Sequence, residues 1–415
     1  MFKPLLRFMR PVAAPIGLTG YNLYLLRSLK RPEWVYGGNG RIPYKKLTLV
    51  PAAKITGADI SLCERLIRAY HRALSNPAAG EALSGLWSEN IKRHYQKLTL
   101  GLDQKDPPQL ATALSSMFTE SFLYGIASAD QFKQASSWLG SRIWSLKCLD
   151  DVVSLAECLG LVRTECPEQG VLGYAFKDGL EELVEKIESA LGMSIGFPNV
   201  GAPYGISAGH SLITMEAPEH IGVAWRVNQA LQYYLHRQYS DSPNIVEIGA
   251  GFGGTAHWLM KLRKMSVGSY TIVDLPLANV LQGYFLSKAF GDTKVSFYEE
   301  PLPEIAGQGA IAILPTIALD SLKEKNTDLL VNENSMPEMP EQAVVDYIMW
   351  AKNNVRGIFY SYNQEAYSPM KGVAQVLVPD VVRRVGGLKL LTRNFSWMRR
   401  GYVEEVYACG EALAR

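Results

Sequence analysis

The spacing of apolar residues changes along this chain, and the change separates two differently built regions. Between residues 56 and 192 apolar residues recur every three or four positions, as in Cys63, Leu66 and Tyr70, which predicts helices that bury one face. Beyond residue 240, short apolar runs alternate with helical patterns. This alternation predicts an α/β fold, with a doubly wound, mainly parallel sheet of seven strands behind a large helical N-terminal region.

The same pattern predicts where the regions begin and end. At 415 residues the chain is too long for one ordinary α/β domain. We expect a basic N-terminal arm at 1–55, a helical domain at 56–195 and an α/β domain at 196–415. Many turn-forming residues between 196 and 220 predict an ordered loop that joins the last two. The final two apolar runs leave no room for a helix between them, so we expect a closing antiparallel pair.

Charge is balanced over the whole chain and uneven at its start. The net charge of +2 gives no reason to expect a nucleic-acid partner, but residues 1–50 hold nine Lys and Arg residues against Glu33 alone, a net charge of +8. Such an arm fits the surface of an anionic membrane, and it fits equally the chain's own body or a second subunit of a homo-oligomer. No apolar run is long enough to span a bilayer, and no signal-peptide core is evident, so we predict a cytoplasmic protein, peripheral to the inner membrane if the arm binds lipid.

Cysteine and histidine spacing gives no sign of a metal centre. The five cysteines show no CxxC pattern, which indicates reduced thiols, and the six histidines show no paired-ligand spacing. We therefore predict no metal site, although a magnesium ion held by carboxylates would leave little trace in the sequence.

The most informative stretch is a short apolar run that ends in a glycine-rich turn. Gly249, Gly251 and Gly254 match the dinucleotide pattern GxGxxG, whereas Glu247, Gly249, Gly251 and Gly253 match the acidic-x-GxGxG pattern of class I enzymes that use S-adenosylmethionine (SAM). A carboxylate at 247 would repel the pyrophosphate of a dinucleotide, but SAM carries an ammonium and a sulfonium. We therefore predict that the loop binds SAM.

The next apolar run ends at Asp274, which we predict to hold the two ribose hydroxyls of the cofactor. The alternative is that Asp274 caps the helix that follows, which Pro276 would suit as an early helical residue. The full set of predicted cofactor contacts is Glu247, Gly249, Ala250, Gly251, Gly253, Asp274, Leu275, Leu314, Pro315 and Asn332.

Four blocks of sequence resemble one family. They are 246–253, 273–276, the Asn-x-Asn-Ser-Met-x-Glu-Met block at 332–339 with Tyr347 beyond it, and 359–363. Together they resemble the bacterial sugar O-methyltransferases, a branch of the class I SAM-dependent enzymes, over about residues 200 to 415. The resemblance implies a Rossmann-like methyltransferase domain with SAM as cofactor, and a methyl acceptor next to the block at 332–339.

A sugar hydroxyl is a weak acid, so a base is expected near the transferred methyl group. We predict Glu338 as the base, with His210 of the turn-rich loop as the second candidate and Asn334 as a group that orients the hydroxyl. The alternative for Glu338 is a cap on the helix that begins near Pro340. Glu333 is expected on the strand face opposite Asn332 and Asn334. Predicted substrate contacts are Tyr204, Ser207, Tyr362, Asn363 and Tyr367.

The sequence thus predicts a SAM-dependent O-methyltransferase that acts on a sugar hydroxyl, in a bacterial surface polysaccharide or a glycosylated metabolite. Three alternatives stay open: methylation of a non-sugar small molecule, an NAD-dependent oxidoreductase, and a catalytically inactive SAM-fold subunit of a glycan-assembly complex.

Overall fold

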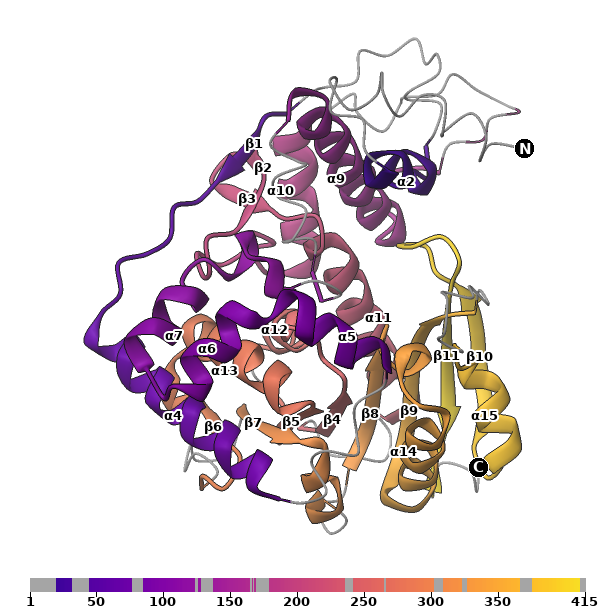
Figure 1. Ribbon diagram of the computed structural model, residues 1–415. Helices are drawn as coiled ribbons and strands as arrows, with labels where there is room; N and C mark the ends of the chain where they lie inside the picture. The colour runs from indigo at the N-terminus through magenta and orange to yellow at the C-terminus, as the bar shows by residue number, and fades with distance from the viewer. Residues whose placement is uncertain are drawn as a thin grey trace.

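The computed structural model describes residues 20–31, 45–76, 85–123, 126–127, 137–164, 166, 168, 179–235, 242–264, 266–301, 309–322, 327–365 and 375–410. Figure 1 shows an α/β body that carries a cover of helices from the first half of the chain. Within the described residues, no helix is long and apolar enough to cross a membrane.

An eight-stranded sheet lies at the centre of the α/β body, one strand more than predicted. Its order is β10-β11-β9-β8-β4-β5-β7-β6. Neighbours from β6 to β9 run parallel, and β11 is antiparallel to both β9 and β10, as the prediction of a closing pair required. The strands are β4 (Asn244–Ile248), β5 (Ser269–Asp274), β6 (Val295–Phe297), β7 (Ala310–Pro315), β8 (Thr327–Glu333), β9 (Val355–Gln364), β10 (Lys389–Phe395) and β11 (Tyr402–Ala408).

Helices cover both faces of this sheet, because successive residues of a buried strand point to opposite sides. One face, with Ile245 and Ile272, packs against α11 (Ala217–Leu235), α12 (Gly254–Leu262) and α13 (Pro276–Phe290). The other face, with Val246 and Leu330, packs against α14 (Glu341–Asn354) and α15 (Val378–Val385). The mainly parallel, doubly wound arrangement is therefore confirmed.

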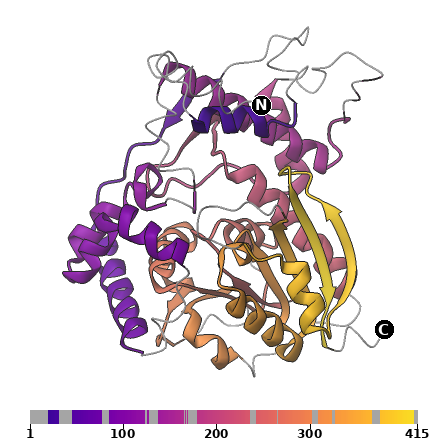
Figure 2. The same cartoon turned by 45° about the vertical axis from the view of Figure 1, so that its right-hand side comes forward.

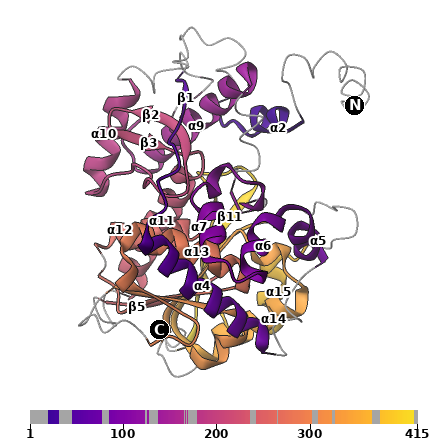
Figure 3. The ribbon, with the colours of Figure 1, turned by 60° about the vertical axis from the view of Figure 1, so that its left-hand side comes forward.

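The first half of the chain is helical in its described parts and shares a core with the sheet. Its helices are α2 (Gly20–Ser28), α4 (Gly57–Ser75), α5 (Gly85–His94), α6 (Gln96–Asp103), α7 (Pro107–Leu114), η2 (Met117–Thr119), η3 (Ser121–Leu123), α9 (Trp138–Cys158) and α10 (Leu180–Leu191). A capping box between Thr56 and Asp59 begins α4. Leu66 of α4 packs beside Gly283 of α13, where a Cβ would lie 2.5 Å from it. Figures 2 and 3 show α4 to α7 lying over the end of the sheet.

The segment at 196–220 is more regular than the predicted loop. It contains the short strands β2 (Tyr204–Ala208) and β3 (Ser211–Ile213), which form a separate three-stranded sheet with β1 (Leu47–Leu49). The turn-forming residues lie around these strands, and because they are so many, the sequence pattern did not predict the hairpin.

Part of the basic arm lies on the protein. Arg31 follows α2, is 7% exposed and forms ion pairs with Asp150 and Glu157 of α9. Lys30 pairs with Asp151 of the same helix at 3.3 Å. Most other cations of the arm lie outside the described residues, so a lipid contact stays a prediction.

Candidate active site

A cavity opens at the carboxyl ends of the parallel strands, between the sheet and the helical cover. Its walls come from both halves of the chain, with the glycine loop and the ends of β5 and β8 on one side and α5 and the residues after η3 on the other. The lining residues are Trp87, Ile91, Tyr95, Ile126, His220, Glu247, Gly249, Ala250, Gly251, Thr255, Val273, Asp274, Leu275, Leu277, Ala278, Thr316, Glu333, Asn334, Ser335, Glu338, Met339, Pro340, Ala343 and Tyr347.

Sheet register explains why three carboxylates meet in this cavity. Glu247 pairs with Ile272 on one side and with Val331 on the other, so these residues share a face of the sheet. Two positions further along β5 and β8, Asp274 and Glu333 lie on that same face. All three line the cavity.

The glycine loop turns sharply after β4. Gly249, Gly251 and Gly253 all have positive φ, at 70°, 61° and 94°. At Gly249 the neighbouring chain is also close, because a Cβ there would lie 2.2 Å from Oγ of Ser335. Gly249 and Gly251 line the cavity, whereas Gly253 is the N-terminal cap of α12 and does not. Glycine at 249 thus meets a conformational and a steric requirement together.

Glu247 and Asp274 are buried beneath this loop. The hydroxyl of Tyr270 donates to Glu247 at 2.7 Å, and burial raises the pKa of Glu247 to about 7. Asp274 accepts from the backbone N–H of Leu275 at 2.7 Å and from the side-chain amide of Gln282 at 2.6 Å. Burial raises the pKa of Asp274 to about 6 in spite of these bonds. Gln282 also donates to the carbonyl of Gly251 at 3.0 Å, and so joins the loop to the carboxylate.

Residues after β8 form the other side of the site. Asn334 has a φ of 58°, an uncommon value for a residue with a side chain, and its Oδ1 is buried without a partner among the described residues. Glu338 ends the short helix η8 (Met336–Glu338), and burial raises its pKa to about 7. The α14 helix begins after Pro340 without a side-chain cap, so Glu338 does not have the capping role considered as its alternative.

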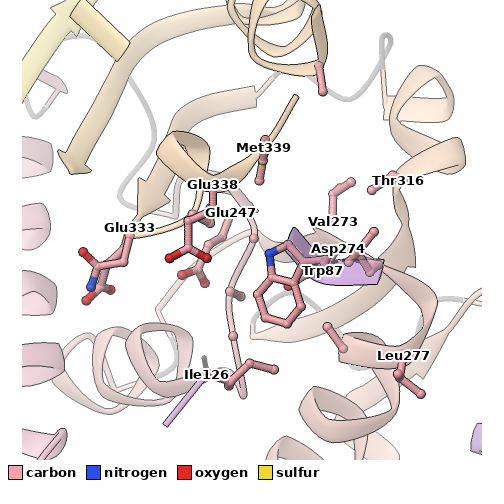
Figure 4. Close-up of a pocket in the computed structure, with 18 of the residues that line it drawn as sticks. Trp87, Ile126, Glu247, Val273, Asp274, Leu277, Thr316, Glu333, Glu338 and Met339 are labelled. Carbon is pink, nitrogen blue, oxygen red and sulfur yellow. Dashed lines mark hydrogen bonds between the residues drawn. The ribbon is translucent and has the colours of Figure 1, made fainter. Parts of the chain in front are cut away.

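Figure 4 shows how the labelled side chains are arranged. Glu333, Glu338 and Glu247 gather on one side of the view, Asp274 and Thr316 lie on the other, and the Trp87 ring stands between them. Glu333 and Asp274 thus lie toward opposite ends of one space, and Glu247 comes from β4, the strand between theirs.

Three predicted site residues from the turn-rich segment do not reach this cavity. His210 lies exposed in the turn between β2 and β3. Tyr204 is 7% exposed and packs against Trp144, and the exposed Ser207 bonds to Thr48 at 2.9 Å. The hairpin directs them away from the sheet end, so the structure does not bring them together with the other candidates.

Three further predicted site residues do not line the cavity but bond to the chain around it: Asn332, Asn363 and Tyr362. The Asn332 amide donates to the carbonyl of Ile248 at 2.9 Å and accepts from the Asn363 amide at 2.9 Å. The Tyr362 hydroxyl bonds to Ser396 at 2.7 Å and donates to Glu219 at 3.2 Å. These groups hold the ends of β4, β8 and β9 together. The expectation that Asn332 contacts the cofactor and Asn363 and Tyr362 the substrate is corrected accordingly.

The cofactor contacts predicted at the end of β7 are not found at the cavity. Leu314 and Pro315 belong to the end of β7 and do not line the cavity, whereas the next residue, Thr316, does. Tyr367 lies outside the described residues.

Sequence reasoning missed several lining residues. Glu333 is predicted on the face opposite Asn332 and Asn334. It does lie opposite Asn332, which bonds to the carbonyl of Ile248, but β8 ends at Glu333, and Asn334 lines the cavity with it. The register of Glu247 against β8 would have identified it. His220, Trp87 and Ile126 carry no local signal, because only the fold brings them to the strand ends.

Comparisons with known proteins found only remote structural similarity. No family model matches the chain, and no curated protein matches it. Similar solved structures include an rRNA methyltransferase from Streptomyces viridochromogenes, at 12% identity and a TM-score of 0.28, over 47% of this chain and 86% of that one. An O-methyltransferase family protein from Burkholderia thailandensis is 9% identical, with a TM-score of 0.32, over 47% of this chain and 60% of that one.

A third similar structure is the 1,6-didemethyltoxoflavin-N1-methyltransferase of Burkholderia thailandensis, with bound 1,6-didemethyltoxoflavin and S-adenosylhomocysteine. It is 13% identical, with a TM-score of 0.31, over 46% of this chain and 78% of that one. The names of these three proteins describe methyltransferases, and each matches less than half of this chain. At such low values, the similarity says nothing about the ligand or the reaction of this chain.

Proposed function

We propose that this chain is a SAM-dependent methyltransferase that transfers a methyl group to an oxygen of a small molecule. One observation carries the proposal. Glu247 is the next-to-last residue of β4 and Asp274 the last residue of the adjacent parallel strand β5, and both line one cavity with a glycine loop of positive φ. Ligands of open α/β sheets bind at this edge.

The residues present fit SAM better than a dinucleotide. Asp274 accepts hydrogen bonds from the N–H of Leu275 and from the Gln282 amide, and a carboxylate has further lone pairs that ribose hydroxyls can use. The buried Glu247 suits the ammonium of the methionine end. No Lys or Arg lines the cavity among the described residues, and a pyrophosphate would meet carboxylates there.

The bound cofactor would supply an electrophilic methyl group, so the protein has to orient the acceptor and exclude water. Asn334 and Glu338 line the cavity beyond the loop, and we propose that they bind the acceptor molecule. Trp87, Ile91 and Ile126 would close the space from the helical side.

For the acceptor itself, we propose a sugar hydroxyl. The support is the family resemblance of the block at 332–339, together with an aromatic ring, Trp87, and carboxylates that line the same cavity. A non-sugar small molecule with a hydroxyl on an apolar ring is the second candidate, because Ile91, Tyr95 and Ile126 make one wall apolar. A cytoplasmic location beside the membrane, where surface glycans are assembled, belongs to the same proposal.

Two measurements test this function. Calorimetry on the full chain should show binding of SAM and of S-adenosylhomocysteine but not of NAD. Incubation with labelled SAM and a panel of methyl glycosides, glycans and simple phenols should add one methyl group, seen as a gain of about 14 daltons, to one class of compound. Tight NAD binding without SAM binding would overturn the proposal.

A further inference from the structure

A buried polar cluster on the acceptor side of the cavity has no role in the function proposed above. It consists of His220, Thr255 and Glu333, which come from the first turn of α11, the first turn of α12 and the last residue of β8. All three residues line the cavity. An inference about this cluster rests on the proposed methyl transfer.

Glu333 is held in one orientation with one oxygen free. Its side chain is 6% exposed, and its Oε2 accepts a hydrogen bond from the hydroxyl of Thr255. Its Oε1 is buried and has no hydrogen-bond partner among the described residues. A buried carboxylate oxygen without a donor is costly, so a ligand that supplies a donor is expected there.

His220 presents one ring nitrogen to this free oxygen. Its Nδ1 is enclosed without a hydrogen-bond partner, and it packs so closely on Gly254 that a Cβ there would lie 2.3 Å away. Its Nε2 lies 3.9 Å from Oε1 of Glu333. The neutral ring with its proton on Nε2 is the favoured tautomer, because a buried N–H group without an acceptor at Nδ1 is rare.

The separation of these two atoms is informative. At 3.9 Å, Nε2 and Oε1 are too far apart for a direct hydrogen bond. A single oxygen atom about 2.8 Å from each of them would bridge the gap. We propose that the acceptor hydroxyl lies there, with Glu333 as the catalytic base and His220 as the donor that orients the oxygen.

In the transfer, the acceptor oxygen forms a bond to the methyl carbon while the carbon–sulfur bond breaks. The electron pair of the broken bond stays on sulfur, which becomes the thioether of S-adenosylhomocysteine. The hydroxyl proton passes to Oε1 of Glu333 and leaves to solvent with the product. His220 stabilises the oxygen as negative charge develops on it.

The charges around Glu333 are consistent with a base that becomes ionised when the cofactor binds. Burial raises the pKa of Glu333 well above its usual range, the charges of Glu219 and Glu247 raise it further, and the Thr255 hydrogen bond and Arg399 oppose them. Burial lowers the pKa of His220, against the influence of Glu219 and Glu216. The positive charge of SAM favours the ionised form of Glu333, so cofactor binding should release its proton and prepare the base.

The test uses SAM itself as the first probe. Calorimetry of the full chain in buffers of different ionisation enthalpy counts the protons released on SAM binding. Glu333→Gln should release fewer protons than the unaltered chain, with a SAM dissociation constant within about threefold. Glu341→Gln is the matched control, because Glu341 begins α14, pairs with Arg384 at the surface and does not line the cavity. Its proton release should be unchanged.

The second arm measures methyl transfer to the compound that the panel identifies. Glu333→Gln should lower kcat about a hundredfold or more, and His220→Gln should lower kcat about tenfold, each with SAM affinity retained. Glu338→Gln should mainly raise the acceptor KM.

The outcomes separate the two proposals. If the unaltered chain binds no SAM, the proposed function fails and this inference fails with it. If SAM binds but Glu333→Gln releases as many protons or keeps its rate, only the assignment of the base is overturned. If Glu338→Gln loses the rate and Glu333→Gln keeps it, the base is Glu338. If no compound of the panel is methylated, the number of protons released on SAM binding alone tests the assignment of Glu333.

Discussion

The two ends of the cavity are built from the chain in opposite ways. At the cofactor end, the loop, Glu247, Asp274 and Gln282 all come from the short stretch between residues 247 and 282. At the acceptor end, Trp87, His220 and Glu333 come from parts of the chain that only the fold brings together.

This difference separates what a local motif can specify from what requires tertiary packing. The cofactor end needs a backbone turn and two carboxylates at fixed positions on neighbouring strands, and consecutive residues can supply both. The acceptor end needs side chains that approach one small group from several directions. Substitutions at the cofactor end should therefore change backbone geometry and local charge. Substitutions at the acceptor end should remove single side-chain atoms that contact the acceptor.

The largest effect is expected from Gly249→Ala at the cofactor end. The alanine would sit at a φ of 70° with its Cβ 2.2 Å from Oγ of Ser335, so left-handed strain of about 1–2 kcal/mol adds to overpacking of about 1–3 kcal/mol. Chemical denaturation should show this loss of unfolding free energy, and SAM binding should be lost. Gly291→Ala is the control, because its φ is 96° and a Cβ there meets nothing within 4 Å. Equal losses in both variants would show that strain alone matters at Gly249.

A pH series should reveal the cost of the buried carboxylates. Burial raises the pKa of Glu247 from 4.5 to about 7, so the folded chain holds that proton more tightly than the unfolded chain. The stability that this group contributes is complete below pH 4.5 and is lost as the pH rises through 7. Relative to the unaltered chain, Glu247→Gln should gain stability between pH 5 and pH 8, by up to about 3 kcal/mol.

Thermal or chemical unfolding of both proteins across this pH range measures the difference. Added SAM should reduce it, because a bound cation favours the ionised carboxylate. A difference that does not change with pH would place Glu247 in a more polar environment than its burial indicates.

Asp274→Ala should weaken SAM binding by about 1–3 kcal/mol, because charge-assisted hydrogen bonds to the ribose are lost. Calorimetry provides the measurement, and Asp292→Ala, at the surface beside Arg65, provides the control. An unchanged affinity would limit Asp274 to a structural role through its bonds with the N–H of Leu275 and the Gln282 amide, since α13 begins without a side-chain cap.

The smallest effect is expected from His210→Ala. His210 is exposed in the β2–β3 turn, so both the unfolding free energy, within about 0.5 kcal/mol, and the methyl-transfer rate should be unchanged. An inactive His210→Ala would mean that the β2–β3 hairpin moves to the cavity during turnover. The hairpin would then be a third part of the site, beside the two ends of the cavity.

The sequence predicted the cofactor end and the sheet more fully than the rest, and the reasons are physical. Short apolar runs and the glycine turn after Ile248 are local features, so the positions of the strands along the chain and of Asp274 at a strand end follow from them. The short strand β6 has only three residues, and its place at the edge of the sheet is not specified locally.

The errors at the site follow from the direction in which side chains point. Asn332 and Glu333 are consecutive, so a strand places one toward the interior and the other toward the cavity, and the choice depends on the register with β4. His210 was favoured because it lies among turn-forming residues, yet His220, ten residues later on a helix, is the histidine that lines the cavity. The packing of α11 brings His220 to the cavity, and no local sequence pattern predicts that packing.

The core that the helical cover shares with the sheet has a consequence for synthesis. Leu66 and its neighbours on α4 pack on α13 and β6, which leave the ribosome only after more than half of the chain has been made. Until then the part of the α4 face that α13 and β6 cover has no partner, and a nascent chain of this kind exposes a surface prone to aggregation. We expect the helical segment to require chaperones during translation, and the chain to yield insoluble protein when it is cut between the two halves.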